Sequence, residues 1–172
     1  MTNQTLHAPW RMDYIRSLEN ADTSQGGCFL CQAAATLDDS QQRSQRLVLW
    51  HSAHTLVLMN KFPYTSGHVL AAPKRHVASL EDLSSDELFD LQTQTVEAIR
   101  ALRKVLSPQG FNVGINLGRC AGAGVPGHLH QHIVPRWAGD VNFMSVVGQV
   151  RIQPLAMQTI YDDLIAARQI EK

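Results

Sequence analysis

The segment His128-Leu-His-Gln-His-Ile-Val-Pro135 decides what fold and chemistry this chain is expected to have. Its histidines alternate with Leu129, Gln131 and Ile133. Because alternate residues of a β-strand share one face, the pattern predicts a strand over 128–135 with all its imidazoles on one face, about 6–7 Å apart. The opposite face then suits a packed core. The histidines are His128, His130 and His132.

Two functions fit three imidazoles on one strand face. They could ligate a metal ion, because imidazole is a common metal ligand. Alternatively, one histidine is a nucleophile and the others hold an anion. The glycine-rich segment 118–127 comes directly before the strand, and such loops expose backbone N–H groups that bind phosphate oxygens. The sequence therefore favours phosphate chemistry over metal ligation by all three histidines.

Short apolar runs upstream predict further strands. Residues 47–50 and 55–59 are separated by polar residues, which is typical of a hairpin. A third strand is predicted over 68–72, where Pro73 ends it. The polar stretch 36–46 is predicted to be a loop or turn.

A long helix is predicted over about 80–106, where leucine and isoleucine recur with helical spacing. Ser84 or Ser85 can cap its first turn. Residues 111–117 alternate as a strand does, and 155–170 have the pattern of a C-terminal helix. Together these elements predict an α+β domain with an antiparallel sheet of about five strands.

The length of 172 residues suits one domain, with 1–27 as an N-terminal arm, 28–172 as the domain and 146–152 as a possible last strand. Fifteen basic residues balance fifteen acidic ones, which argues against nucleic acid as a partner but allows a pocket for a small anion. No apolar run approaches the roughly 18 residues that a membrane span needs, and the N-terminus has no signal core. We therefore expect a cytoplasmic protein with no membrane partner.

The pair Cys28-x-x-Cys31 has the spacing of half a zinc site. In a reducing compartment such a pair is more often metal-binding or redox-active than a structural disulfide. A pair of buried or redox cysteines is the alternative. The third cysteine, Cys120, has no evident partner in the sequence and is interpreted as a loop thiol.

Two segments resemble the signatures of the histidine triad (HIT) family. Residues 127–136 resemble its His-x-His-x-His signature, and 60–76 resemble its other hallmark, a loop and strand that end in Pro-Lys-x-His. Both occur in the family's order with a helix between them, so the resemblance covers about 28–136. Residues 135–144 and 10–14 are also similar to a bacterial Ap4A (diadenosine tetraphosphate) phosphorylase-like branch.

The resemblance implies a nucleophile. In this family the middle histidine, here His130, attacks the α-phosphorus of a nucleotide and forms a nucleotidyl-histidine intermediate. A neutral imidazole is nucleophilic at pH 7 and is a good leaving group in the second step. Its other nitrogen needs a hydrogen-bond acceptor, which a backbone carbonyl could supply. His132 would contact the phosphate oxygens or the leaving-group bridge, and His68 would face the same phosphate from the neighbouring strand.

The resemblance also implies binding residues. Asn60 matches a position that binds ribose hydroxyls, and Asn116 matches an asparagine near the phosphate. Many members carry Gly-Gln-Ser or Gly-Gln-Thr before the triad, where this chain has Ala123-Gly-Val-Pro126. Backbone N–H groups of Gly124 and Val125 could still bind phosphate, whereas the proline has none.

A structural zinc ion is the cofactor that the resemblance implies. Several members, and the related galactose-1-phosphate uridylyltransferases, complete a Cys-x-x-Cys pair with two histidines. The matching residues here are Cys28, Cys31, His76 and His128. Two thiolates and two imidazoles form a closed tetrahedral set, which is typical of a structural ion. Proteins that resemble this one are usually homodimers, so a homodimer is expected.

The expected function is cleavage of dinucleoside polyphosphates such as Ap4A by a nucleotidyl hydrolase or transferase. Transfer to water gives hydrolysis, and transfer to phosphate gives phosphorolysis with ADP as a product. Some Ap4A phosphorylases have glutamine in place of the third histidine, whereas this chain keeps His132, so hydrolysis remains open. The alternatives are a nucleoside phosphoramidase that cleaves AMP–N bonds, a nucleotide-binding module with little catalysis, and a metalloenzyme that uses the triad as ligands.

Overall fold

The computed structural model describes residues 27–140 and 155–169. The predicted arm over 1–27 lies outside these residues except for Gly27, and so does the predicted strand over 146–152. No helix in the described part is long and apolar enough to cross a membrane.

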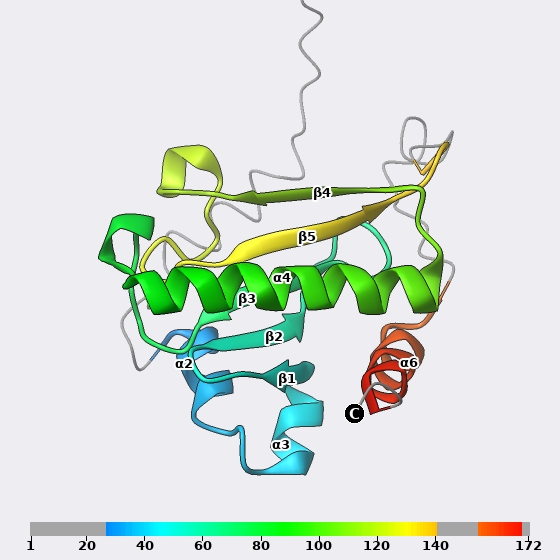
Figure 1. Cartoon of the computed structure of the whole chain (residues 1–172), viewed down its shortest axis with the longest axis horizontal. Coiled ribbons are helices and arrows are strands. Elements are labelled where there is room, and N and C mark those ends of the chain that lie inside the picture. The colour runs from blue at the N-terminus through cyan, green and yellow to red at the C-terminus, as the bar shows by residue number, and fades with distance from the viewer. Residues whose placement is uncertain (1–26, 141–154, 170–172) are drawn as a thin grey trace, which may run out of the picture.

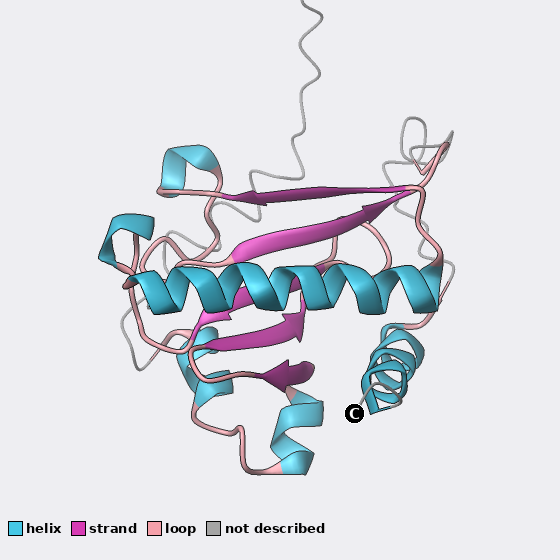
Figure 2. Ribbon diagram, viewed as in Figure 1, coloured by secondary structure: helices cyan, strands magenta, loops and turns pink. Residues whose placement is uncertain are grey.

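One antiparallel sheet of five strands forms the centre of the molecule (Figures 1 and 2). Its order is β1-β2-β3-β5-β4, so β5 lies between β3 and β4 although it is last in sequence. The strands are β1 (Val48–His51), β2 (Thr55–Met59), β3 (Val69–Pro73), β4 (Gly110–Ile115) and β5 (Gln131–Arg136). The predicted α+β class and the number of strands are therefore confirmed.

Both faces of the sheet are covered at β2 and β3, which is why these two strands are buried along their whole length. On one face Val57 and Met59 join the core formed with the long helix and the C-terminal helix. On the other face Leu56 and Leu58 pack with the short helix α2 (Phe29–Ala34). Alternate residues of one strand thus reach two separate cores.

The long helix α4 (Ser85–Leu106) packs across one face of the sheet and buries Leu91 and Leu102 completely. Its N-terminus is a capping box, because Ser84 accepts from the Glu87 backbone N–H while the Glu87 carboxylate accepts from the Ser84 N–H. The helix therefore begins at 85 and not near 80 as predicted. The residues before it form a separate 3-10 turn (Leu80–Asp82), because the Ser84 cap starts a new run of helical hydrogen bonds.

The C-terminal helix α6 (Met157–Gln169) confirms the helix predicted over 155–170. It packs against α4 and β1 through buried Ile160 and Leu164. The Tyr161 hydroxyl donates to the Val48 carbonyl at 3.0 Å.

Two short helices were not predicted. One is α2, and the other, α3 (Ser40–Gln45), lies in the stretch predicted to be a loop. The Asp39 side chain caps α3 by accepting from the Gln42 N–H at 3.0 Å. Because α3 buries no residue, its sequence carries no apolar period that could reveal a helix.

Candidate active site and metal centre

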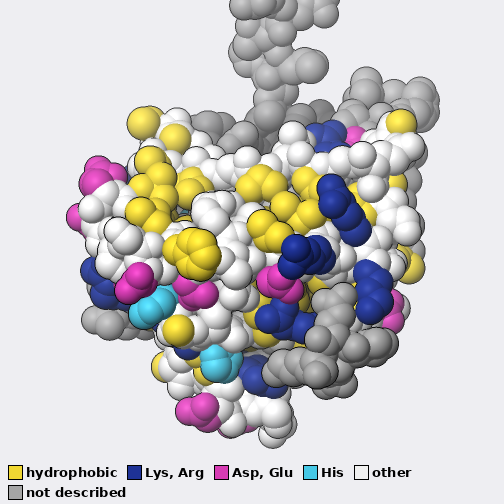
Figure 3. Space-filling model, viewed as in Figure 1, with side chains coloured by type: hydrophobic (Ala, Val, Ile, Leu, Met, Phe, Trp, Pro, Cys, Tyr) yellow, Lys and Arg dark blue, Asp and Glu magenta, His cyan; other side chains and the backbone are white. Residues whose placement is uncertain are grey.

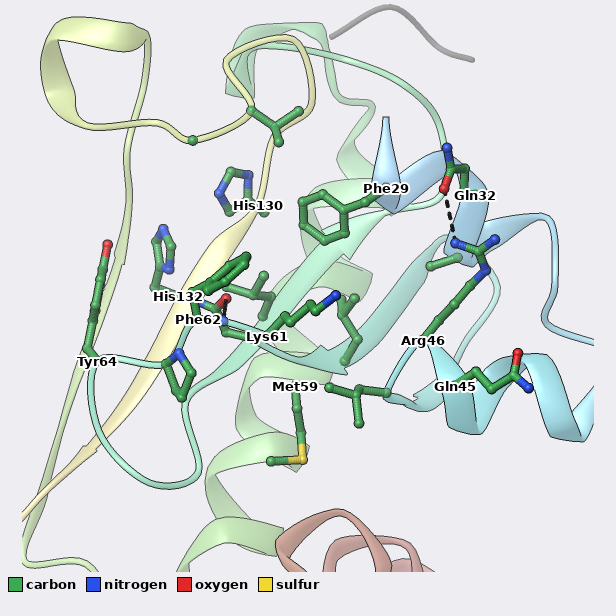
Figure 4. Close-up of a pocket in the computed structure, with 18 of the residues that line it drawn as sticks. Phe29, Gln32, Gln45, Arg46, Met59, Lys61, Phe62, Tyr64, His130 and His132 are labelled. Carbon is green, nitrogen blue, oxygen red and sulfur yellow. Dashed lines mark hydrogen bonds between the residues drawn. The ribbon is translucent and has the colours of Figure 1, made fainter. Parts of the chain in front are cut away.

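A pocket of about 830 Å³ opens on the face of the sheet that α2 covers. Its wall comes from α2, the end of α3, the loop after β2 and the glycine-rich loop, and His130 and His132 lie at one end (Figure 4). Among the described residues, the charged side chains that line the pocket are those of Arg46 and Lys61, and no Asp or Glu lines it. The pocket is therefore cationic in a chain whose formal charge is zero.

The His130 ring has a fixed tautomer. Its Nδ1 lies 2.8 Å from the carbonyl oxygen of His128. A carbonyl can only accept, so Nδ1 carries the proton and Nε2 keeps its lone pair. Burial lowers the pKa of His130, although the bond to the His128 carbonyl opposes this. The ring is therefore neutral at pH 7, with a nucleophilic nitrogen in a residue that lines the pocket.

The tautomer of His132 is set by two other residues. The backbone N–H of Tyr64 donates to His68 Nδ1 at 3.1 Å, so the His68 proton lies on Nε2. That Nε2 is 3.0 Å from His132 Nδ1 and donates to it. His132 consequently carries its proton on Nε2. Burial, together with the nearby His130, lowers the pKa of His132 to about 4, so this neutral tautomer is the form at pH 7.

The predicted binding residues separate into two groups. Asn60, Gly124 and Val125 line the pocket with the two histidines. The Asn60 amide also supports the histidine pair: its Nδ2 is 3.2 Å from His68 Nδ1, and its Oδ1 accepts from the Phe62 N–H at 3.0 Å.

His68 and Asn116 do not line the pocket. The His68 side chain is fully buried, so it meets His132 and not a ligand. Asn116 donates to the Gly122 carbonyl at 3.4 Å, and its Nδ2 lies 3.5 Å from His132 Nε2.

The strand predicted over 128–135 begins three residues later than predicted, although all three imidazoles lie on the α2 side of the sheet. Strand β5 begins at Gln131, and Leu129 N–H donates to Val77 instead of joining the sheet. His128 therefore precedes the strand, and its ring contacts Cys28, the N-cap of α2, on the same side of the sheet as the pocket. Only His130 and His132 remain side by side, with ring centroids 5.0 Å apart.

The other part of the prediction for this segment is correct. Leu129 and Ile133 are buried in the core on the α4 side. Gln131 faces the same way, and its amide donates to Thr95 at 3.1 Å and accepts from Gln92 at 3.0 Å. These bonds attach the start of β5 to α4 through Gln131, the residue between His130 and His132 in sequence.

The four predicted metal ligands lie together. One ligand atom from each of Cys28, Cys31, His76 and His128 lies within 4.8 Å of the others. His128 Nε2 donates to the Pro73 carbonyl at 2.8 Å, which leaves Nδ1 unprotonated, 3.2 Å from Cys28 Sγ. His76 Nδ1 is 3.1 Å from Cys31 Sγ.

The chemistry of this cluster fits a zinc ion. Burial raises the pKa of the Cys31 thiol to about 11, and the neighbouring Cys28 adds to the rise. A divalent cation reverses that effect because it stabilises both thiolates. Two sulfurs and two imidazole nitrogens are a typical closed set for structural zinc. The cluster also touches the active site, because the His128 carbonyl holds the His130 ring.

Several pocket residues were not predicted from the sequence. Tyr64 lies over the paired histidines, with its ring centroid 4.7 Å from that of His68 and 5.8 Å from that of His132. Its place in the 60–76 hallmark was the available signal. Arg46 and Phe29 carried no such signal, because one ends a polar stretch and the other is an ordinary apolar residue.

A five-stranded antiparallel sheet, with a glycine-rich loop beside paired histidines at the start of its β5 strand, is the arrangement of a HIT domain. Residues 41–139 match the HIT domain family, and the chain belongs to this family. It is 37% identical over 153 residues to a Mycobacterium tuberculosis protein named AP-4-A phosphorylase, a match that covers 88% of this chain and 77% of that protein.

Two further matches come from more distant proteins. The asymmetrical bis(5'-nucleosyl)-tetraphosphatase of Schizosaccharomyces pombe is 39% identical over 100 residues, which are 58% of this chain and 54% of that protein. A crystal structure of a zinc-bound histidine triad family protein from Mycobacterium smegmatis superposes with a TM-score of 0.61 at 26% identity. That superposition covers 80% of this chain and 97% of the other.

Proposed function

We propose that this protein is an enzyme that cleaves dinucleoside polyphosphates such as Ap4A through a nucleotidyl intermediate on His130. One observation carries the proposal. The His128 carbonyl accepts the Nδ1 proton of His130, so the Nε2 of this residue, which lines the cationic pocket, is unprotonated and keeps its lone pair. The relatives named AP-4-A phosphorylase and bis(5'-nucleosyl)-tetraphosphatase support this substrate class.

In the first step the lone pair of His130 Nε2 attacks the α-phosphorus. A P–N bond forms, and the bond from phosphorus to the bridging oxygen of the leaving nucleotide breaks. His132 Nε2–H is the available donor for that oxygen, because His68 fixes the proton there. Backbone N–H groups of Gly124 and Val125 would bind the nonbridging oxygens, and Asn60 would contact the ribose.

In the second step an acceptor takes the nucleotidyl group and His130 leaves as a neutral imidazole. Water would release AMP, and inorganic phosphate would release ADP. The substrate supplies ATP as the leaving group in either case when it is Ap4A. The acceptor therefore decides whether the enzyme is a hydrolase or a phosphorylase.

We assign a structural role to zinc at Cys28, Cys31, His76 and His128. A closed set of four protein ligands leaves no position for substrate. A zinc ion bound there would hold the His128 backbone, whose carbonyl positions the His130 ring. Thiolate ligands persist in a reducing compartment, which supports the cytoplasm as the place of action.

A homodimer is proposed through the face formed by α4 and β4. Strand β4 is an edge of the sheet, and edges present unpaired backbone groups. Phe89 (77% exposed), Val96 and Val113 are exposed hydrophobic residues of these two elements, and Figure 3 shows hydrophobic side chains gathered there. A second copy related by twofold symmetry would cover both.

Light scattering during gel filtration tests the dimer. Wild type should run as a dimer, and Val113→Asp should run as a monomer because the charge would be buried at the interface. Leu155→Asp, which alters an exposed residue at the start of the C-terminal segment, is the matched control. A monomeric wild type at micromolar concentration would refute this interface.

The test of the enzyme is single-turnover incubation with Ap4A, with and without inorganic phosphate. ADP and ATP formed only with phosphate identify a phosphorylase, and AMP and ATP formed without it identify a hydrolase. His130→Ala should form neither, and acid-labile nucleotidyl protein should accumulate only when His130 is present. If His130→Ala cleaves Ap4A at the wild-type rate, the nucleophile assignment is wrong.

A further inference from the structure

We infer that Arg46 selects a 6-oxopurine, guanine or hypoxanthine, over adenine in the nucleotide that becomes bonded to His130. The inference rests on the proposed function, which places the α-phosphorus at His130. It adds a specificity-determining residue at the opposite end of the pocket. Arg46 belongs to neither of the two segments that identify the family.

The pocket has two polar ends and an apolar middle. His130 and His132 lie at one end, and Arg46 and Gln32 lie at the other, with Phe29 between them (Figure 4). Ala33, Leu58 and Leu70 also line the pocket. A volume of about 830 Å³ is ample for a nucleotide. With its phosphorus at His130, a nucleotide places its base in the apolar middle and the edge of the base toward Arg46.

Arg46 is held at this end by its neighbours. Its Nη1 donates to Gln32 Oε1 at 3.0 Å, and its backbone N–H donates to the Gln42 carbonyl as the last bond of α3. A guanidinium has five N–H donors in a planar fork and no acceptor. One nitrogen is used by Gln32, which orients the fork and leaves the guanidinium's other donors available to a base.

The purine bases differ at the edge that such a fork would meet. Guanine and hypoxanthine present two adjacent acceptors, O6 and N7, whereas adenine presents one acceptor, N7, beside its N6 amino donor. An arginine fork therefore makes two bonds to a 6-oxopurine. To adenine the fork makes one hydrogen bond, at N7, and its second N–H faces the N6 amino group, which is also a donor. Bidentate pairing of arginine with O6 and N7 is the commonest specific contact between proteins and guanine.

Binding of a phosphate is the other use of a cationic side chain in this pocket. Lysine also binds phosphate, as a point charge, so Lys would retain a phosphate-binding role at position 46. Recognition of a base edge needs the fork, so Lys would not substitute. Arg46→Lys therefore separates the two roles.

A mixed dinucleotide, Ap4G, gives the direct test because the two bases compete within one molecule. If guanine occupies the pocket, GMP is bonded to His130 and ATP leaves. If adenine occupies the pocket, AMP is bonded and GTP leaves. The ratio of ATP to GTP in the first turnover therefore reports the base that the pocket retains, whichever acceptor completes the reaction.

Wild type should release ATP over GTP by roughly tenfold, the low end of the discrimination by a bidentate pair, because Arg46 is exposed at the rim. Arg46→Met and Arg46→Lys should bring the ratio to within about twofold of one. Arg43→Met alters an arginine of α3 three residues before Arg46 that does not line the pocket, so its ratio should equal that of wild type.

Equilibrium binding of mononucleotides keeps the test independent of catalysis. GMP and IMP should bind His130→Ala about tenfold more tightly than AMP, and 7-deaza-GMP should lose most of that advantage because it lacks N7. Excess GTP from Ap4G, an unchanged ratio in Arg46→Met, or equal affinities for GMP and AMP would overturn the inference. If Ap4G is not cleaved while GMP still binds more tightly than AMP, the proposed function fails and the selectivity stands.

Discussion

His68 Nε2 lies 3.0 Å from His132 Nδ1, and this contact sets the protonation of a pocket residue from a side chain that no ligand can touch. The backbone N–H of Tyr64 forces the His68 proton onto Nε2. His132 must then accept at Nδ1 and keep its own proton on Nε2. A backbone N–H in the loop between β2 and β3, the residue before β3 and a side chain of β5 thus act in series.

Replacing His68 should lower turnover without abolishing nucleotide binding. In His68→Leu the donor to His132 is lost, so His132 can adopt the tautomer that has no proton for the leaving oxygen. We expect kcat for Ap4A to fall roughly ten- to hundredfold, with KM little changed. This is the range found when the hydrogen-bond partner of a metal-bound histidine is removed. His132→Phe should lose more, about 10²- to 10⁴-fold, because the donor itself is gone.

His54→Leu is the matched control, since His54 is an exposed histidine in the turn between β1 and β2. Steady-state measurement of kcat and KM for Ap4A in these three variants tests whether His68 sets the proton position on His132. Wild-type kcat in His68→Leu would contradict the relay.

His132 should not titrate near neutral pH. Burial and the nearby His130 lower its pKa from 6.5 to about 4, so NMR of its imidazole should show no protonation between pH 8 and pH 5.5. The unfolded chain takes up this proton near pH 6.5, earlier than the folded protein does. Its contribution to stability is therefore complete above pH 6.5 and is lost as the pH falls toward 4. His132→Phe should remove this part of the pH dependence of unfolding; a midpoint near 6.5 in wild type would disprove the burial argument.

Zinc content should follow the cysteine–histidine cluster and not the triad. Purified wild type, His130→Ala and Cys120→Ser should each hold about one zinc per chain, whereas Cys28→Ser and Cys31→Ser should hold little. Chelation should lower the Tm of wild type, by an amount that grows with free zinc in the reference sample. Elemental analysis with thermal unfolding checks both statements. Loss of zinc in His130→Ala would instead place the ion at the triad.

Gly67 should not tolerate a side chain. Its φ is +77°, which favours glycine, and a Cβ there would overlap Leu106 Cδ1 and approach Pro135 Cγ to 3.3 Å. Gly67→Ala should therefore lower the free energy of unfolding by about 1–3 kcal/mol. Gly110→Ala is the control, because a Cβ at Gly110 meets open space. Urea unfolding compares the two; equal midpoints would show that the turn before His68 adapts.

Much of the fold was predictable because it is encoded by neighbouring residues. Strand β2 lies where the apolar run 55–59 predicts it, and α4 ends at Leu106, just before the predicted stop at Ser107 and Pro108. Local signals missed α3, whose cap is a single aspartate and whose six residues include none that is buried. The start of α4 was also misjudged, because the apolar period extends back to Leu83 whereas the Ser84 cap begins the helix at Ser85.

The residue types of the site were set by the sequence by itself: alternating histidines after a glycine-rich loop, a Cys-x-x-Cys pair and Pro-Lys-x-His. Only the tertiary structure decided which histidine serves which centre. Cys28 approaches a histidine 100 positions away, and His68 approaches one 64 positions away. The tautomers, the contact of His128 with the cysteine pair and the position of Arg46 in the pocket depend on such contacts. They follow from packing and hydrogen bonds between distant segments, which no local pattern of residues encodes.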